Sequence, residues 1–278
     1  MAVTNGWGQG VINNSIEWGK GSTNATNGWG EIYEDSPSGD TAIEGASFSE
    51  VYSTEYDGVD DYVKTDANYT ELDGANKLTV SAWIKVGTTS DSLSYLCNIL
   101  GGSLFQVGIR LQTTTNTQCW FYINNSSGSN RASANIGALK GDGNWHHLLV
   151  CADLSLGSGE IEMYLDGVSK TVSGTITETT FPSATSALHI GTRADSLASV
   201  YGGDIDEFAL WSGTDLRGSV ATIYNSGVPN DLNSNGLTAP TSWYRFEEGS
   251  GTTATDSGST SNDATLINGT AFTTDVPT

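Results

Sequence analysis

Short runs in which apolar and polar residues alternate are the feature that most constrains the fold of this chain. Between Leu78 and Val86 every second residue is apolar, the period of a strand with one buried face. Similar strand-like runs recur at residues 105–110, 118–123, 145–152, 160–165, 187–191, 205–211 and 243–246. Gly supplies 34 of the 278 residues and Pro only five, which suits tight turns between strands. The sequence therefore predicts an all-β protein.

Turn and helix signals indicate how these strands connect. Asp166-Gly167, placed between two strand-like runs, predicts a two-residue hairpin. Only residues 215–225 have helical spacing, and Gly227 follows as a stop signal. Many short strands with one late helix predict two packed antiparallel sheets and one short helix.

The first 45 residues differ from the rest of the chain. Trp7, Trp18 and Trp29 recur at intervals of 11, each followed by Gly, and Tyr33 adds a fourth aromatic residue. Disordered tails are poor in aromatic residues, and so few copies cannot close a solenoid. We therefore expect an extended N-terminal arm, residues 1–45, that docks on another protein through these four residues. The Gly and Asn content leaves a floppy tail as the alternative.

Charge argues against two classes of partner. The chain has 32 acidic and 11 basic residues, a net charge of −21, so we expect neither nucleic-acid binding nor attachment to an anionic membrane. Residues 31–73 hold 13 of the acidic side chains and one Lys. This run predicts a solvated face, with calcium binding or a basic partner surface as alternatives.

Export and membrane signals are missing from the sequence. The first ten residues have neither the basic start nor the apolar core of a signal peptide, and no run approaches the roughly 20 apolar residues of a membrane-spanning helix. The odd number of cysteines, with no CxxC pair, predicts buried reduced thiols and synthesis in a cytoplasm. These are Cys97, Cys119 and Cys151.

Several segments together resemble the laminin G-like domain, a member of the concanavalin A-like lectin/glucanase jelly rolls. They are residues 56–63 (YDGVDDYV), 81–83 (SAW), 145–147 (WHH), 163–167 (MYLDG) and 203–208 (GDIDEF). The order and spacing match from about residue 46 to residue 227. The resemblance implies a jelly-roll sandwich over residues 46–278. It leaves the function open, because this fold serves lectins, adhesion modules, hydrolases and structural proteins.

The chain departs from that family pattern at its C-terminal end. Residues 243–251 (WYRFEEGSG) resemble the segment that usually opens such a module, and here they come last. We therefore expect a permuted order in which residues 241–273 complete the sheets of their own domain. The alternative is exchange of this segment with a neighbouring subunit, which would produce a homo-oligomer.

The arm has a resemblance of its own. Residues 28–36 (GWGEIYEDS) are similar to N-terminal segments of virion and tail-associated proteins of marine bacteriophages, several of which carry laminin G-like domains. This implies a protein made in the host cytoplasm and located at the virion surface, where residues 1–45 bind other virion proteins. The expected function is a non-enzymatic structural role in a phage particle, as a capsid decoration or as part of a tail or fibre.

A glycoside hydrolase is a less favoured interpretation. Hydrolases of this fold carry a Glu-x-Asp-x-x-Glu strand, and residues 160–165 and 204–209 each lack its last carboxylate. His146 and His147 are strand neighbours that point to opposite faces, and His189 is isolated. No catalytic residue is nominated.

The alternative function is that of an adhesin for host-surface glycans, which requires an exposed aromatic platform. Trp83, Trp120 and Tyr122 are its candidate residues. The acidic surface would repel anionic polysaccharides, so we expect weak, avidity-dependent binding at most.

A structural metal ion is a further expectation. Members of this fold often hold one structural Ca²⁺, and the resemblance implies Asp206 and Asp256 as its ligands, while a local capping or pairing role for Asp206 is the alternative. No other cofactor is expected.

Overall fold

The computed structural model describes residues 25–26, 32–33, 48–101, 105–113, 117–125 and 128–278. The chain divides into two compact units, Met1–Ser49 and Glu50–Thr278. In the first unit, β1 (Ala25–Thr26) and β2 (Ile32–Tyr33) pair antiparallel. The other residues of the expected arm, including Trp7, Trp18 and Trp29, lie outside the described residues.

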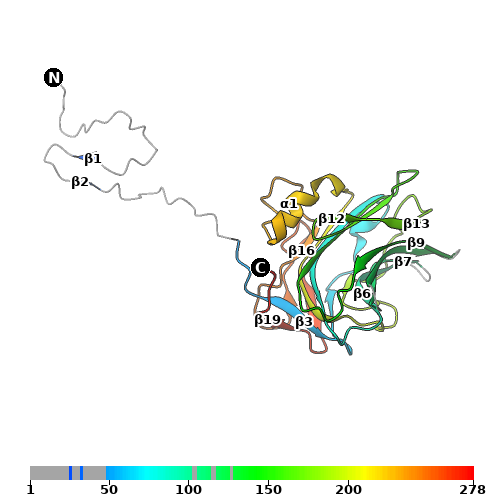
Figure 1. Ribbon diagram of the computed structural model, residues 1–278, viewed down its shortest axis with the longest axis horizontal. Helices are drawn as coiled ribbons and strands as arrows, with labels where there is room; N and C mark the ends of the chain where they lie inside the picture. Colours follow the sequence, from blue (N-terminus) through cyan, green and yellow to red (C-terminus); the bar gives the residue numbers. More distant parts are fainter. Residues whose placement is uncertain (1–24, 27–31, 34–47, 102–104, 114–116, 126–127) are drawn as a thin grey trace, which may run out of the picture. The chain divides into compact units, whose positions relative to one another are not determined.

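The second unit is a sandwich of two antiparallel sheets (Figure 1). The first sheet has the order β12-β11-β10-β5-β15-β3-β19, and β16 also pairs with β15. Its strands are β3 (Ser53–Asp57), β5 (Lys77–Val86), β10 (His146–Asp153), β11 (Ile161–Leu165), β12 (Val168–Lys170), β15 (Gly202–Ser212), β16 (Ser242–Tyr244) and β19 (Ala271–Thr273).

The second sheet has the order β13-β9-β8-β7-β6-β14-β4-β18-β17. Its strands are β4 (Tyr62–Thr65), β6 (Leu93–Gly101), β7 (Phe105–Thr113), β8 (Thr117–Asn125), β9 (Gly128–Gly137), β13 (Val172–Thr175), β14 (His189–Ile190), β17 (Thr253–Ala254) and β18 (Ala264–Ile267). One α-helix, α1 (Val220–Tyr224), and three 3-10 turns, Thr70–Leu72, Arg217–Ser219 and Asn225–Gly227, complete the unit. The predicted all-β, two-sheet jelly-roll-like sandwich with one short helix is confirmed.

The core lies between the two sheets. The apolar side chains of β5 predicted from the alternation, among them Val80 and Ile84, meet Phe121 of β8 there. The polar positions of β5 are buried as well, Thr79 at 0% and Ser81 at 3% exposure, because α1 and its flanking turns cover the outer face of this strand. β5 is therefore buried on both faces, whereas the alternation predicted only one buried face.

The predicted hairpin at residues 166–167 is confirmed. Leu165 of β11 pairs with Val168 of β12, and Asp166 and Gly167 have positive φ angles of 52° and 73°. A Cβ on Gly167 would lie 2.7 Å from a ring carbon of Tyr224. The turn therefore also packs against the C-terminal end of α1.

The C-terminal strands pair with strands from the beginning and middle of the same unit. β16 pairs with β15, β18 with β4, and β19 with β3. Trp243, Tyr244 and Phe246 are at most 2% exposed. The segment after residue 241 thus contributes side chains and backbone hydrogen bonds to both sheets.

The cysteines are buried and free, as the sequence predicted. Burial raises the pKa of each thiol, which keeps it in the neutral form. Among the described helices, none combines the length and apolar character needed to cross a membrane.

Candidate functional site

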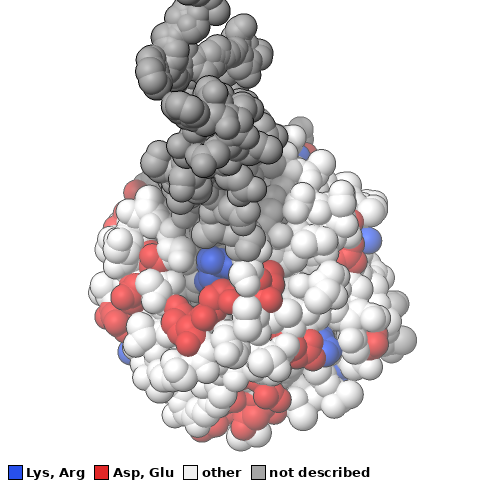
Figure 2. All heavy atoms as spheres, turned by 90° about the vertical axis from the view of Figure 1, so that its left-hand side faces the viewer, with Lys and Arg blue, Asp and Glu red and all other residues white. Residues whose placement is uncertain are grey.

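Charge is unevenly distributed along this acidic chain. On the face shown in Figure 2, acidic side chains are spread widely and basic ones are few. Residues 92–141 instead contain no Asp or Glu and three basic residues, Arg110, Arg131 and Lys140. This stretch forms β6, β7, β8 and β9, four consecutive neighbours in the second sheet. One part of that sheet is therefore built without carboxylates.

Three side chains meet on the outer face of these strands. Along β8, Cys119, Phe121 and Ile123 point into the core, so the alternate residue Trp120 lies on the opposite face. Arg110 of β7 is directly opposite Trp120 in the ladder. Arg131 of β9 is opposite Tyr122, which places it diagonal to Trp120.

Both arginines lie over the half-buried indole of Trp120. The guanidinium carbon is 4.8 Å from the ring centroid for Arg131 and 5.6 Å for Arg110, within the range of cation–π contacts. Trp120 Nε1 and Arg110 Nε are buried and have no hydrogen-bond partner. Within the described part of the chain, neither guanidinium is paired with a carboxylate. We call Arg110, Trp120 and Arg131 the Arg-Trp-Arg cluster.

The other two proposed glycan contacts are buried. Tyr122 is 5% exposed, and its hydroxyl oxygen accepts a hydrogen bond of 2.7 Å from Asn98 Nδ2. Trp83 is 5% exposed and lies against Tyr224 of α1 and His147, with ring centroids 6.1 and 5.1 Å away. Neither ring offers an open face to a sugar, so only Trp120 of the three keeps a partly exposed ring.

The space beneath α1 is too small for a ligand. A cavity of about 10 Å³ lies between β5, β10 and the turn after α1. It is lined by Ser81, Trp83, His147, Glu207, Ile223, Pro229, Asn230 and Leu232. That volume is about one water molecule.

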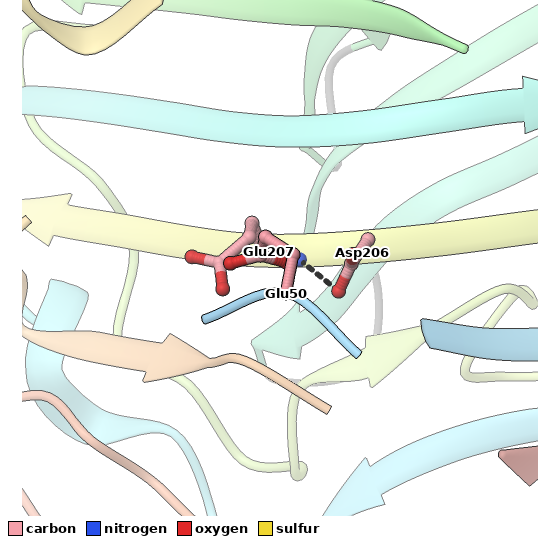
Figure 3. A group of neighbouring side chains, drawn as sticks. All are labelled: Glu50, Asp206 and Glu207. Atoms are coloured by element: carbon pink, nitrogen blue, oxygen red, sulfur yellow. Dashed lines mark hydrogen bonds between the residues drawn. The ribbon is translucent and has the colours of Figure 1, made fainter. Parts of the chain in front are cut away.

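A cluster of buried carboxyl groups lies at β15. Glu50, Asp206 and Glu207 each bring a carboxylate oxygen within 4.8 Å of the others (Figure 3). Consecutive residues of a regular strand point to opposite faces, but β15 is irregular between Asp206 and Ala209, and Glu207 has a φ of 49°. This bulge brings Asp206 and Glu207 together. We call the three residues the acidic cluster.

The surroundings of the acidic cluster leave part of its charge uncompensated. Glu207 accepts a hydrogen bond of 2.6 Å from Trp243 Nε1 and one of 3.1 Å from Arg245 Nε. Asp206 Oδ2 and Glu50 Oε2 are buried without a hydrogen-bond partner. Burial raises the pKa of all three groups, and the neighbouring carboxylates raise those of Asp206 and Glu207 further. Hard oxygen donors in this arrangement fit a cation such as Ca²⁺.

Asp256, the other expected calcium ligand, has a different role. Its carboxylate accepts hydrogen bonds from the backbone amides of residues 243, 258 and 262 and from the hydroxyl of Thr260. It therefore organises the loop after β17. The structure does not bring it into the acidic cluster with Asp206. A second group of three carboxylates, Asp57, Asp60 and Asp61, lies at the end of β3.

Three of the carboxylates considered for hydrolysis are hydrogen-bonded or buried. Glu162 accepts a hydrogen bond of 3.0 Å from Arg217 and another from Tyr164. Asp206 and Glu207 are 0% and 3% exposed. A substrate in solution cannot reach these last two groups in this conformation.

The histidines are held by neighbouring residues. His146 bonds to Asp166 and Asp142 at 2.7 and 3.0 Å, and the hydrogen bond with Asp166 is the main reason that its pKa is raised. His147 is fully buried against Ser81, and burial lowers its pKa to about 4.

Four residues of these two clusters were not predicted from the sequence. Arg110 and Arg131 become neighbours of Trp120 only through strand register, although the absence of carboxylates over residues 92–141 was visible in the sequence. Glu207 joins Asp206 through the bulge in β15, and Glu50, which precedes β3, lies close to both. Of the residues proposed for docking, Tyr33 lies in β2, and its side chain is outside the described part.

Comparisons with known proteins agree with the fold. A laminin G-like family, described as the concanavalin A-like lectin/glucanases superfamily, matches residues 57–221, which is more than half of the chain. The comparison with curated protein sequences found no match.

The solved structures that are similar in fold include the following two. A heptameric SAP-like pentraxin from Limulus polyphemus has a TM-score of 0.52 at 14% identity, over 78% of this chain and 94% of that chain. A protein from Bacteroides ovatus ATCC 8483, named for carbohydrate binding, has a TM-score of 0.55 at 15% identity, over 82% of this chain and 61% of that chain. Together with the family match, these results show that the chain belongs to the concanavalin A-like lectin/glucanases superfamily.

Proposed function

We propose that this protein is a non-enzymatic component of a phage particle. Residues 1–45 attach it to other virion proteins, and the sandwich of residues 46–278 is displayed as a lectin-like domain at the virion surface. The N-terminal resemblance of residues 28–36 to virion and tail-associated proteins supports the attachment role. Capsid decoration and a tail or fibre position are both compatible with this proposal.

The observation that carries the proposal is the closure of the sandwich within Glu50–Thr278. The C-terminal strands pair with β3, β4 and β15 of the same unit, so this unit has a hydrophobic core of its own. A domain that folds by itself leaves residues 1–45 available for attachment. The burial of Asp206 and Glu207 and the hydrogen bonds of Glu162 support a role without catalysis.

Deletion of residues 1–40 tests whether the N-terminal residues attach the protein while the sandwich folds on its own. We expect the shortened chain to melt at nearly the same temperature as the full chain and to be missing from purified particles. A chain with Val168→Ala, a change at an exposed position of β12, serves as the control that still incorporates. Normal incorporation of the shortened chain would contradict the attachment role.

A second candidate function is recognition of host-surface glycans by the displayed domain. The partly exposed ring of Trp120, on strands that carry no carboxylate, favours it. The two functions are compatible, since a displayed domain can also bind. Loss of binding to a glycan array on Trp120→Ala, with unchanged particle incorporation, would separate the two.

We also propose one structural Ca²⁺ at the acidic cluster. Asp206 Oδ2 and Glu50 Oε2 would coordinate it, because both are buried acceptors without a donor. Adding calcium should raise the melting temperature, and chelation should lower it. Asp206→Asn should abolish the response, while Asp256→Asn should leave it in place. A calcium response that survives Asp206→Asn would contradict this assignment.

A further inference from the structure

The Arg-Trp-Arg cluster has the properties of a binding site for an anion. It presents two guanidinium groups and the indole N–H, all of which are hydrogen-bond donors, and no acceptor. Two of these donors, Arg110 Nε and Trp120 Nε1, are buried without a partner. A buried donor without a partner is costly and rare in folded proteins. Neither atom is open to a ligand in this conformation, so a ligand with negatively charged oxygen atoms would contact the outer N–H groups of the two guanidinium groups, of which that of Arg131 is exposed.

The electrostatic surroundings also distinguish this face from the rest of the chain. The net charge is −21, yet the four strands that build this face contribute no carboxylate. In the described residues, other arginines are paired: Arg193 with Asp195, Arg217 with Asp215 and Arg245 with Glu207. Arg110 and Arg131 instead stack on Trp120, which fixes their planes while leaving their N–H groups free for a ligand.

The neighbouring side chains indicate what else the ligand carries. Gln112 and Gln118 face each other across β7 and β8, two positions from Arg110 and Trp120 and on the same face. Ser133 of β9 is opposite Trp120. Amide and hydroxyl groups can both donate and accept, which matches the hydroxyl groups of a sugar. The Arg-Trp-Arg cluster and these three side chains together combine donors for an anion with groups that suit sugar hydroxyls.

We propose that the Arg-Trp-Arg cluster binds an acidic saccharide, with the anionic group on the guanidinium groups of Arg110 and Arg131 and the sugar hydroxyls along Gln112 and Gln118. This inference rests on the second candidate function given above and specifies its ligand class. It also revises the expectation that the acidic surface would repel anionic polysaccharides, because the four strands beneath the proposed ligand carry no carboxylate. A carboxylated sugar and a sulfated sugar share this chemistry.

Binding of defined oligosaccharides to the full chain tests the inference by calorimetry at low ionic strength. The probes are hexagalacturonate, its methyl ester as the neutral match, a sulfated heparin hexasaccharide, and a hexaglutamate peptide. We expect one or both acidic sugars to bind and the methyl ester not to bind. Binding should weaken as salt is added, because the contact is between charges.

Variants assign the binding to the cluster. Arg110→Gln and Arg131→Gln should each weaken binding by about 10- to 100-fold, the effect of losing a charge-assisted hydrogen bond. Trp120→Phe keeps an aromatic ring, although a smaller one, under both guanidinium groups and should weaken binding less. Lys77→Gln removes the same charge from the first sheet, where Lys77 pairs with Asp153, and should leave binding unchanged. Melting curves show whether each variant is folded.

The outcomes distinguish failure of the acidic-saccharide inference from failure of the proposed glycan recognition. The methyl ester could bind as tightly as the acid, with binding that the arginine variants leave unchanged and Trp120→Ala abolishes. That result would contradict the acidic class of ligand and leave glycan recognition in place. No binding of any sugar to the folded protein would overturn both. Tighter binding of hexaglutamate than of either acidic sugar would overturn the saccharide in favour of an acidic peptide. Equal effects of Lys77→Gln and the arginine variants would refute the assignment to this face.

Discussion

Replacing Tyr244 with Ala should destabilise the sandwich severely, because this residue joins the C-terminal segment to the core. Tyr244 is 0% exposed, and its ring centroid lies 6.3 Å from that of Phe246 and 6.5 Å from that of Phe208. Its hydroxyl donates a hydrogen bond of 2.7 Å to the backbone oxygen of Asn262. The substitution therefore removes a buried ring and one buried hydrogen bond together.

The expected cost follows from these two contributions. Truncating a buried aromatic side chain to Ala costs about 3–5 kcal/mol, and a lost hydrogen bond adds about 1 kcal/mol. A total of about 4–6 kcal/mol is a large share of the 5–15 kcal/mol that typically stabilises a domain. For a domain of this size it corresponds to a fall of roughly 10–20 °C in melting temperature. Tyr244→Phe, which removes only the hydroxyl, should cost about 1–2 kcal/mol.

Urea denaturation followed by tryptophan fluorescence, with thermal melting alongside, measures these differences. Val168→Ala is the matched control, because Val168 is 60% exposed on β12 and its truncation should change stability by less than about 0.5 kcal/mol. If Tyr244→Ala costs no more than this control, the C-terminal segment does not pack in the core of its own domain. Subunit exchange would then be the better account, and the unfolding midpoint should depend on protein concentration.

Three further predictions follow from buried or crowded positions. Burial lowers the pKa of His147 to about 4, so between pH 4 and 6.5 the unfolded chain binds more protons than the folded chain. The free energy of unfolding should therefore fall by about 3 kcal/mol as the pH drops through this window. An NMR titration of His147 with a midpoint near 6.5 would contradict this prediction. Gly203→Ala should lower the free energy of unfolding in urea by more than about 3 kcal/mol, because Gly203 has a φ of 123° and a Cβ there would lie 2.1 Å from the backbone oxygen of Lys85. Gly218→Ala is the control and should be nearly neutral, since a Cβ at that position meets no atom within 4 Å. Mass spectrometry after alkylation should find no modified thiol in the native protein and three in denaturant, and a disulfide would contradict the buried reduced state of Cys97, Cys119 and Cys151.

The sequence predicted those parts of the fold that local pattern determines. The alternation in Leu78–Val86 marks a strand, and Asp166-Gly167 marks a hairpin, because each depends on neighbouring residues alone. For the same reason the sequence does not predict that Trp83, a candidate glycan contact, is buried. Its place on the outer face of β5 follows from the alternation, but the cover supplied by α1 comes from residues more than 130 positions later. Burial on that face depends on tertiary packing, which a local pattern does not contain.

The two clusters lie beyond local pattern for different reasons. The Arg-Trp-Arg cluster depends on the register between β7, β8 and β9, and a shift of one residue would place Trp120 in the core. The acidic cluster depends on a bulge in β15 that brings Asp206 and Glu207 to the same side. Strand periodicity predicts the opposite arrangement for these two residues. The lack of carboxylates over residues 92–141 was the available sequence signal for the Arg-Trp-Arg cluster, and no such signal marked the acidic cluster.

Photo-crosslinking in assembled particles tests the proposed attachment most directly. A photoreactive amino acid is placed at Trp18 of the N-terminal region in one chain and at the exposed Val168 of the displayed domain in another, and crosslinked partners are identified by mass spectrometry. We predict crosslinks from position 18 to another virion protein and none from position 168. Crosslinks to virion proteins from position 168 alone, or failure to find the protein in any particle, would contradict the account.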